Sequence, residues 1–342
     1  MFDRADLPSM PQLALMFAAA AIVSAALIRV LHPLLVRYAL ARPNARSSHR
    51  TPTPQGGGIA VIAATTIVLA AAALLSPISF SDPMRLAIVF ACVVAMAVVG
   101  ATDDIRPMEA LPRLVLQAIA VLVVLAVLPE SLRIIPALPW WIERALIFLA
   151  VLWFVNLVNF MDGIDWITVA EVVPVTAALA LFGLMGALPA DATLVALALC
   201  GAMIGFAPFN RPVARLFLGD VGSLPIGLAL GWLLVLLAAG HLAAALLLPL
   251  YYVADATITL LRRLINGEQI MQAHRSHFYQ RALDGGLSVY QIVGRVFWLN
   301  IALIVLATAT LLSPSRLLHL AAVAAGCILV ARLLHSFARR KR

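Results

Sequence analysis

The sequence predicts an all-α integral membrane protein with about eleven transmembrane helices, and three observations support this prediction. Of the 342 residues, 63% are hydrophobic and 12% are charged, whereas a soluble domain carries about twice that charged fraction. Apolar runs of roughly 20 residues, long enough to cross a bilayer, fill most of the chain. Most arginines fall in the short connections between them. We therefore expect a single polytopic membrane domain over residues 1–342.

Each apolar run is interpreted as one spanning helix. The first run is longer than the apolar core of a signal peptide and no small-residue cleavage site follows it, so we expect it to be retained. The predicted spans lie near residues 12–32, 57–75, 84–101, 111–128, 140–159, 168–187, 191–208, 222–239, 241–261, 290–312 and 316–335.

The arginines predict the orientation. They follow the odd-numbered spans, so the positive-inside rule places the N-terminus in the periplasm and the C-terminus in the cytoplasm. We interpret the net charge of +8 as topological anchoring and expect no nucleic-acid partner. Lys341 is the only lysine, so arginine must supply any cationic contact to phosphate. The cytoplasmic segments are expected near residues 33–56, 102–110, 160–167, 209–221, 262–289 and 336–342.

Ionisable side chains gather on that cytoplasmic side. Lipid does not tolerate such groups without a task, so they predict an active site on the cytoplasmic face. A transporter would more often place them near the midplane of broken helices. The residues concerned are Asp103, Asp104, Asp162, Asp165, Asp220, Glu268, His274 and His277.

The stretch 156–166, NLVNFMDGIDW, ends an apolar run with four polar side chains. Asn156, Asn159, Asp162 and Asp165 are each three apart, so a helix would place them on one face. We interpret this stripe as a site for a metal or a polar ligand more than as helix capping.

Acidic residues mark two other cytoplasmic loops. Asp103 and Asp104 are adjacent, so on a helix they would point about 100° apart. The structural alternative is a solvated helix end, and the cost of two acids beside an apolar span favours function. Asp220 lies between glycines in the loop 209–223. Carboxylates, waters and phosphate oxygens are ligands that Mg²⁺ prefers.

Two loops admit a structural and a functional interpretation. Residues 49–58, HRTPTPQGGG, would bring backbone amides to an anion, or would allow a helix start with close packing. His274 and His277 are three apart but lack further zinc ligands. A phosphate or sugar contact is favoured for them, and a plain surface helix is the alternative.

Two buried features are interpreted structurally. Asp255 lies about two turns inside a predicted span, and Arg262 or Arg263 is its expected partner. The three cysteines lie far apart in apolar runs and indicate core positions rather than a disulfide or metal set. They are Cys92, Cys200 and Cys327.

Together the motifs resemble the polyprenyl-phosphate N-acetylhexosamine-1-phosphate transferases, glycosyltransferase family 4, the superfamily of WecA, WbpL and MraY. They occur in order over most of the chain, and the third and fourth are the most specific. The expected eleven spans are similar to the WecA/WbpL branch more than to the ten-span MraY branch. The motifs are HRTPTPQGG from 49, TDD from 102, NLVNFMDGID from 156, FLGDVGS from 217 and the segment 255–277.

The resemblance implies a reaction in the bacterial inner membrane. A UDP-N-acetylamino sugar would donate its sugar 1-phosphate to undecaprenyl phosphate and release UMP, with Mg²⁺ or in its place Mn²⁺ as cofactor. The sugar would be GlcNAc or a modified relative such as FucNAc or QuiNAc. The product would start a surface polysaccharide such as O-antigen, in lipopolysaccharide or cell wall biogenesis. A homodimer is a further expectation.

The resemblance also implies roles for individual residues. Asp220 would be the chief Mg²⁺ ligand, with Asp162 beside it. Asp103 and Asp104 would position or deprotonate the lipid phosphate, although a phosphomonoester with a second pKa of about 6 needs no strong base. Of the other residues, Asn159, Asp162 and Asp165 would line the nucleotide and metal pocket, Phe217 would stack on uracil, Asn210 would lie near the diphosphate, and His274, Arg275 and His277 would contact the donor phosphates or sugar.

Three positions depart from the family pattern. Trp166 stands where glycine is common, and its bulk would reshape the nucleotide pocket. The cluster at 274–277, His-Arg-Ser-His, is sparser than in MraY-type enzymes, which argues against a peptidoglycan donor. Arg106 stands near where a lysine is frequent.

Two alternatives to the transferase come from other classes. An intramembrane prenyltransferase or CDP-alcohol phosphotransferase would show two Asp-x-x-x-Asp-type clusters, which the sequence lacks. A polytopic transporter would tolerate loss of Asp220 and would produce no UMP.

Overall fold

The computed structural model describes the chain apart from residues 1–6, 42–51, 76–81, 270–273 and 340–342. The first part of the motif at 49–58, with His49 and Arg50, therefore lies outside the described residues. So does Lys341.

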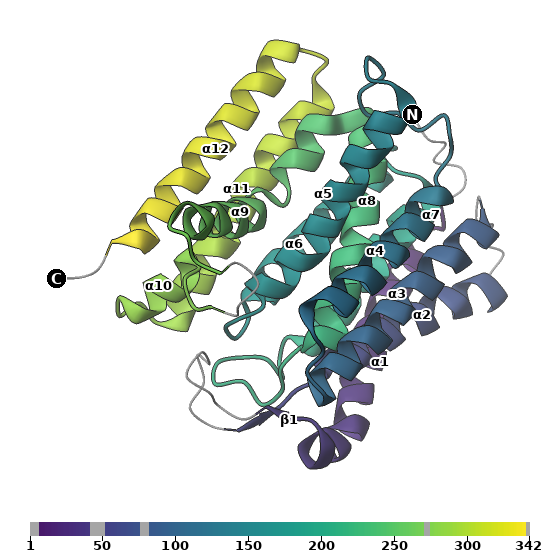
Figure 1. Ribbon diagram of the computed structural model, residues 1–342. Coiled ribbons are helices and arrows are strands. Elements are labelled where there is room, and N and C mark those ends of the chain that lie inside the picture. The colour runs from purple at the N-terminus through teal and green to yellow at the C-terminus, as the bar shows by residue number, and fades with distance from the viewer. Residues whose placement is uncertain (1–6, 42–51, 76–81, 270–273, 340–342) are drawn as a thin grey trace.

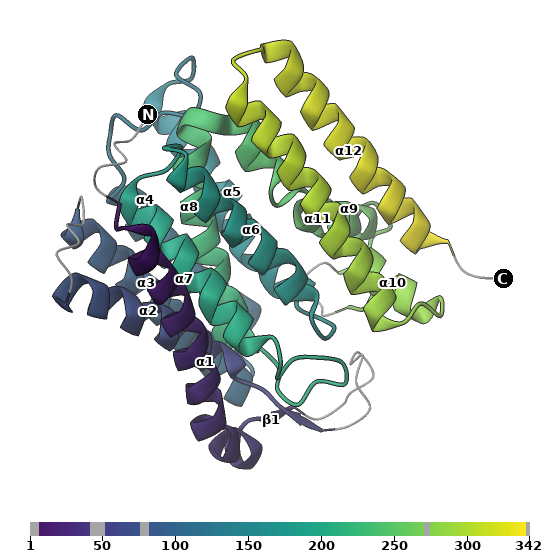
Figure 2. The ribbon, with the colours of Figure 1, turned by 180° about the vertical axis from the view of Figure 1, so that it is seen from behind.

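The described chain is a helical bundle with one two-stranded sheet of minimal length (Figures 1 and 2). Each predicted span except 241–261 coincides with one helix. The elements are α1 (Met10–Tyr38), β1 (Leu40–Ala41), β2 (Thr53–Pro54), α2 (Gly57–Leu75), α3 (Pro83–Ile105), α4 (Ala110–Ala126), α5 (Trp140–Met161), α6 (Ile167–Leu184), α7 (Ala190–Phe206), α8 (Asp220–Leu247), α9 (Leu250–Ile265), α10 (Phe278–Asp284), α11 (Val289–Leu312) and α12 (Arg316–Ala338).

The predicted span 241–261 is wrong as a single helix. The helix α8 bends at His241, where the backbone is not helical, and continues to Leu247. Pro249 then caps α9, a helix of 16 residues. It extends for about 24 Å, which is shorter than the hydrocarbon core of a bilayer. Figure 1 shows α9 nearly end-on, so it runs across the bundle.

The number of membrane crossings stays a prediction. Eight of the described helices are long and apolar enough to cross a membrane, and α4 and α7 are shorter apolar helices. These helices support a multi-pass membrane protein. The expected count of eleven crossings and the expected orientation stay predictions.

Close backbone contacts bring α2, α3 and α8 together at one end of the bundle. A Cβ on Gly100 of α3 would lie 2.2 Å from the carbonyl oxygen of Asp220, and a Cβ on Gly58 would lie 2.1 Å from Cα of Gly222. The amides of Gly57 and Gly58 donate to the carbonyls of residues 217 and 218 at 2.9 Å. The packing interpretation is therefore correct for Gly57 and Gly58, whose amides are bonded to protein carbonyls and are not offered to an anion.

Candidate active site

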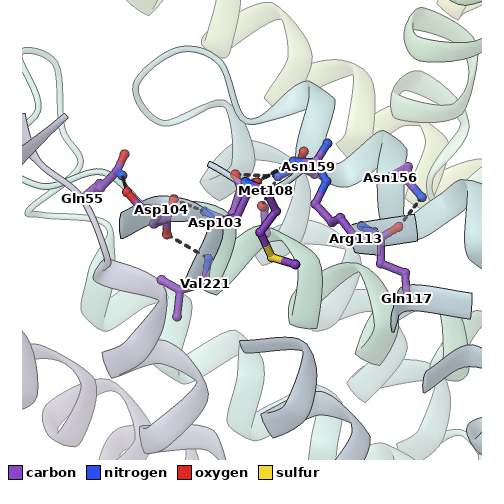
Figure 3. Close-up of polar contacts among 11 residues, drawn as sticks. Gln55, Asp103, Asp104, Met108, Arg113, Gln117, Asn156, Asn159 and Val221 are labelled. Atoms are coloured by element: carbon purple, nitrogen blue, oxygen red, sulfur yellow. Dashed lines mark hydrogen bonds and ion pairs between the residues drawn. The ribbon is translucent and has the colours of Figure 1, made fainter. Parts of the chain in front are cut away.

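An arginine and two carboxylates from three helices form the centre of the candidate site (Figure 3). Asp103 lies near the end of α3, and Asp220 is the first residue of α8. Arg113 of α4 approaches Asp103 Oδ2 to 2.5 Å and Asp220 Oδ2 to 3.5 Å through Nη1. The backbone amide of Met108 donates to the other oxygen of Asp103 at 2.6 Å. The segment joining α3 and α4 thus holds Asp103 and Arg113 together.

The amide of Asn159 orients Asp220 from the α5 side. Its Nδ2 donates to Asp220 Oδ1 at 2.7 Å and to Ser223 Oγ at 2.9 Å. One turn deeper, Asn156 Nδ2 donates to Gln117 Oε1 at 2.7 Å. The predicted polar stripe on α5 therefore exists for its two asparagines.

Asp104 faces a different way from Asp103, as adjacent helical residues should. Its two oxygens accept the backbone amides of Asp220 and Val221, each at 3.0 Å. Its own carbonyl accepts from Gln55 Nε2 at 2.9 Å. Asp104 thereby caps the N-terminus of α8, where a negative charge is stabilising. This contact fixes where Asp220 stands relative to α3.

Asp162 and Asp165 lie in a turn, because α5 ends at Met161. The expected helical stripe is therefore wrong for these two residues. Thr168 Oγ1 donates to Asp162, and the amide of Ala214 donates to Asp165 Oδ2 at 3.0 Å. Burial raises the pKa of Asp162 to about 7, and the charges of Asp104 and Asp165 also raise it, against the hydrogen bond from Thr168. A proton or a cation on Asp162 is therefore favourable near neutral pH.

Asn210 and Trp166 fasten the α7–α8 connection to this turn. Asn210 accepts from the backbone amide of Trp166 at 2.8 Å and donates to the carbonyl of Leu216 at 3.0 Å. Trp166 has a left-handed backbone, with φ at 63°, a conformation that suits glycine better. Its indole donates to the carbonyl of Ala207 at 2.6 Å and meets Tyr290 edge-on. The bulk of Trp166 thus packs on the connection and on α11.

The half-buried Phe217 lies on the same connection. Its backbone amide donates to the carbonyl of Pro54 at 2.9 Å, and its carbonyl accepts from Gly57. β2 and the first residue of α2 thus fix the backbone of Phe217, and its stacking on uracil stays a prediction.

The histidine cluster lies beside the turn that carries Asp162. His274 and His277 stack with ring centroids 4.9 Å apart, and Arg275 forms an ion pair with Asp284 at 2.9 Å. Burial, and after it the neighbouring His277, lower the pKa of His274 to about 4. The predicted partner of Asp255 was wrong, because Asp255 hydrogen-bonds to His277 Nδ1 at 3.2 Å.

The carboxylates around Asp104 are the candidate ligands for Mg²⁺. Within the part of the chain that the structure describes, no group of three or more His, Cys, Asp or Glu side chains is arranged to hold a metal. Mg²⁺ usually takes one or two carboxylates, with substrate phosphates and waters as its other ligands. Asp103, Asp162 and Asp220 each interact electrostatically with Asp104. Such a concentration of carboxylates fits a cation bound largely through substrate phosphate.

Arg113 is the site residue that the sequence reasoning missed. It was interpreted as a topological anchor, like the other arginines of the connections. Arg106 was the arginine that was compared with the family pattern. Arg106 is exposed at the end of α3, whereas Arg113 forms the ion pairs of the site. Its position one turn inside an apolar helix was the available signal, because a charge there needs a partner.

Comparison with known proteins finds that the chain is similar to transferases. Residues 86–238 match the model of glycosyl transferase family 4. A probable undecaprenyl-phosphate N-acetylglucosaminyl 1-phosphate transferase of Bacillus subtilis is 26% identical over 85% of each chain. A decaprenyl-phosphate N-acetylglucosaminephosphotransferase of Mycobacterium leprae is 28% identical over 96% of this chain and 91% of its own. A phospho-N-acetylmuramoyl-pentapeptide-transferase of Streptococcus pneumoniae is 34% identical over 42% of this chain and 44% of its own.

Proposed function

We propose that the chain, whose residues 86–238 match the model of glycosyl transferase family 4, transfers the sugar 1-phosphate of a UDP-N-acetylamino sugar to a polyprenyl phosphate and releases UMP. The observation that carries this proposal is the meeting of Asp103, Arg113 and Asp220 at one end of an apolar bundle. A phosphate at a membrane surface and a nucleotide from solution could both reach that end.

The arrangement suits phosphoryl transfer, which needs charge neutralisation and in-line positioning more than covalent help from protein. Arg113 would bind phosphate oxygens with its planar fork. Asn159 would keep Asp220 pointed at the reacting phosphates. Bound Mg²⁺, held by Asp220 and Asp162, would neutralise the charge that develops on the diphosphate. A lipid phosphate already ionised at neutral pH attacks without a strong base, so Asp103 is assigned to positioning and Asp104 to holding α8.

An apolar cavity supports the lipid acceptor. It lies between α5, α8 and α9, has a volume of about 290 Å³, and is lined by Leu157, two positions before Asn159. Trp153, Gly231, Leu234 and Val253 also line it. Such a surface suits a hydrocarbon chain whose phosphate is held at the carboxylates.

The finer assignment also belongs to this proposal. We assign undecaprenyl phosphate as the lipid, GlcNAc or a relative such as FucNAc or QuiNAc as the sugar, and the bacterial inner membrane as the location. The product would start O-antigen or a similar polysaccharide. A transporter is disfavoured because the similar proteins are transferases.

Mg²⁺ activation is expected to depend on pH. Asp162 has a pKa of about 7, so below pH 7 a proton competes with the cation for its carboxyl. Lowering the pH from 8 to 6 should therefore raise the Mg²⁺ concentration for half-maximal UMP release by about tenfold. Asp162→Asn, in which no proton competes, should remove most of this shift. Equal midpoints for the unmodified protein at the two pH values would contradict the role of Asp162.

UMP release by the purified protein tests the proposed function. The assay contains undecaprenyl phosphate, Mg²⁺ and, one at a time, UDP-N-acetyl sugars. We expect one donor to give UMP that requires both the lipid and the cation. If no donor gives UMP and none binds to folded protein, the transferase proposal fails and transport becomes the favoured alternative.

A further inference from the structure

Asp255 of α9 is a carboxylate with no direct part in the proposed transfer. Its side chain is fully buried, at 0% exposure. Donors converge on both of its oxygens, and together they are His277 Nδ1 at 3.2 Å, the amide of Phe278 at 3.0 Å, the amide of Tyr279 at 3.3 Å, the hydroxyl of Tyr251 at 3.3 Å and the hydroxyl of Thr259 at 3.4 Å.

These contacts fix which ring nitrogen of His277 carries a proton. Backbone amides can only donate, and one of them faces each oxygen of Asp255. Asp255 is therefore an acceptor at both oxygens, and as a carboxylate it has no proton to donate, so His277 Nδ1 donates to it. Nε2 is then the ring nitrogen left for a ligand, and in the neutral ring it is an acceptor.

The ring of His277 is also fixed against the candidate site. It is 3% exposed and stacks on His274 at 4.9 Å and on Tyr279 at 5.7 Å. The Tyr279 hydroxyl donates to the carbonyl of Phe160 at 3.2 Å, and a Cβ on Gly163 would lie 2.1 Å from that hydroxyl. The stack thus packs directly on the turn that carries Asp162.

We propose that Asp255 is a positioning residue of the transfer reaction, which orients His277 so that Nε2 accepts a hydrogen bond from the donor sugar. This inference rests on the proposed function. A bare ring nitrogen matches a hydroxyl or acetamido N–H group and does not match a phosphate oxygen, which is itself an acceptor. Of the donor contacts expected for His277, the sugar is therefore selected over the phosphates.

Asp255→Asn tests the inference beside Thr259→Val. Asparagine keeps the size of the side chain but has no charge and only one acceptor oxygen, so its hydrogen bond to His277 is weaker. Thr259→Val removes a donor to the same carboxylate and leaves His277 in place. The measurements are kcat and KM for the UDP-sugar and the inhibition constant of UMP, which lacks the amino sugar. The same values are measured for His277→Ala and for Asp255→Asn/His277→Ala.

Asp255→Asn should lower kcat/KM for the UDP-sugar by about 10- to 100-fold, the usual effect of losing a partner that orients a functional histidine. UMP inhibition should stay unchanged, which also shows that the variant is folded. Thr259→Val, which keeps the carboxylate of Asp255 and its contact with His277, should lose less kcat/KM than Asp255→Asn. The double variant should be no slower than His277→Ala, because Asp255 acts through His277. Additive losses in the double variant, or unchanged kcat/KM in Asp255→Asn, would overturn the inference.

Nitrogen-15 NMR of the histidine-labelled protein tests the tautomer without turnover. We expect His277 in the unmodified protein to carry its proton on Nδ1, and a proton on Nε2 alone would overturn the inference. If the unmodified protein released no UMP from any donor, the proposed function would fail. The NMR result would still decide whether Asp255 fixes His277.

Discussion

Asp220→Asn is expected to lower UMP release by about 10²- to 10³-fold, the usual cost of losing one group that stabilises charge in a phosphoryl transition state. Asp220 is where Arg113 and Asn159 meet, at 3.5 Å and 2.7 Å from its two oxygens. Asparagine keeps the shape of the side chain but removes the charge that would hold Mg²⁺. The initial rate of UMP formation at saturating lipid and donor measures this effect.

Asp191→Asn is the matched control for Asp220→Asn. Asp191 is a buried aspartate in the first turn of α7, where it accepts from the amide of Asp82. Its variant should retain the rate of the unmodified protein. If Asp220→Asn kept more than a tenth of that rate, or if both variants lost activity equally, Asp220 would have no special place in the chemistry.

Arg113→Ala is expected to lower kcat/KM for the lipid phosphate by about 10²-fold or more, because a phosphate would lose its cationic contact and the carboxylates would lose their neutralising charge. Arg113→Lys should recover part of the loss, since lysine keeps the charge but not the fork. The measurement is the rate of UMP formation at a series of undecaprenyl phosphate concentrations.

Arg106→Ala distinguishes a site arginine from an anchoring one. Arg106 is exposed at the end of α3, seven positions before Arg113. Its loss should leave kcat/KM nearly unchanged. The reverse order of effects, with Arg106→Ala the more damaging, would move the phosphate contact away from Arg113 and to Arg106.

Most helices could be predicted because a run of apolar residues is visible in any sequence. The run 57–75 became α2, which spans Gly57–Leu75. An interruption near His241 was predicted, because one span was expected to end at 239 and the next to begin at 241, and the backbone at His241 is not helical. The helix boundary at Pro249 was missed, although proline commonly marks such a boundary, and α9 begins just after it.

The site could be predicted only as far as local spacing reaches. Asp103 and Asp104 diverge as adjacent helical residues do. The cap that Asp104 forms joins positions more than a hundred residues apart, and local pattern does not predict such a contact. The turn at 162–165 broke the expected stripe, because α5 ends at Met161. The hydrogen bond between Asp255 and His277 was not predicted, because Arg262 and Arg263 are closer to Asp255 in the sequence.

The identity of the two products tests the central claim most directly. Transfer of a sugar 1-phosphate must give UMP and a lipid that carries two phosphates between prenyl chain and sugar. Mass spectrometry of the lipid, with chromatography of the nucleotide from the same reaction, would measure both. We expect UMP and a polyprenyl diphosphate sugar in equal amounts. UDP with a singly phosphorylated lipid-linked sugar would contradict the account, because sugar alone would then have been transferred.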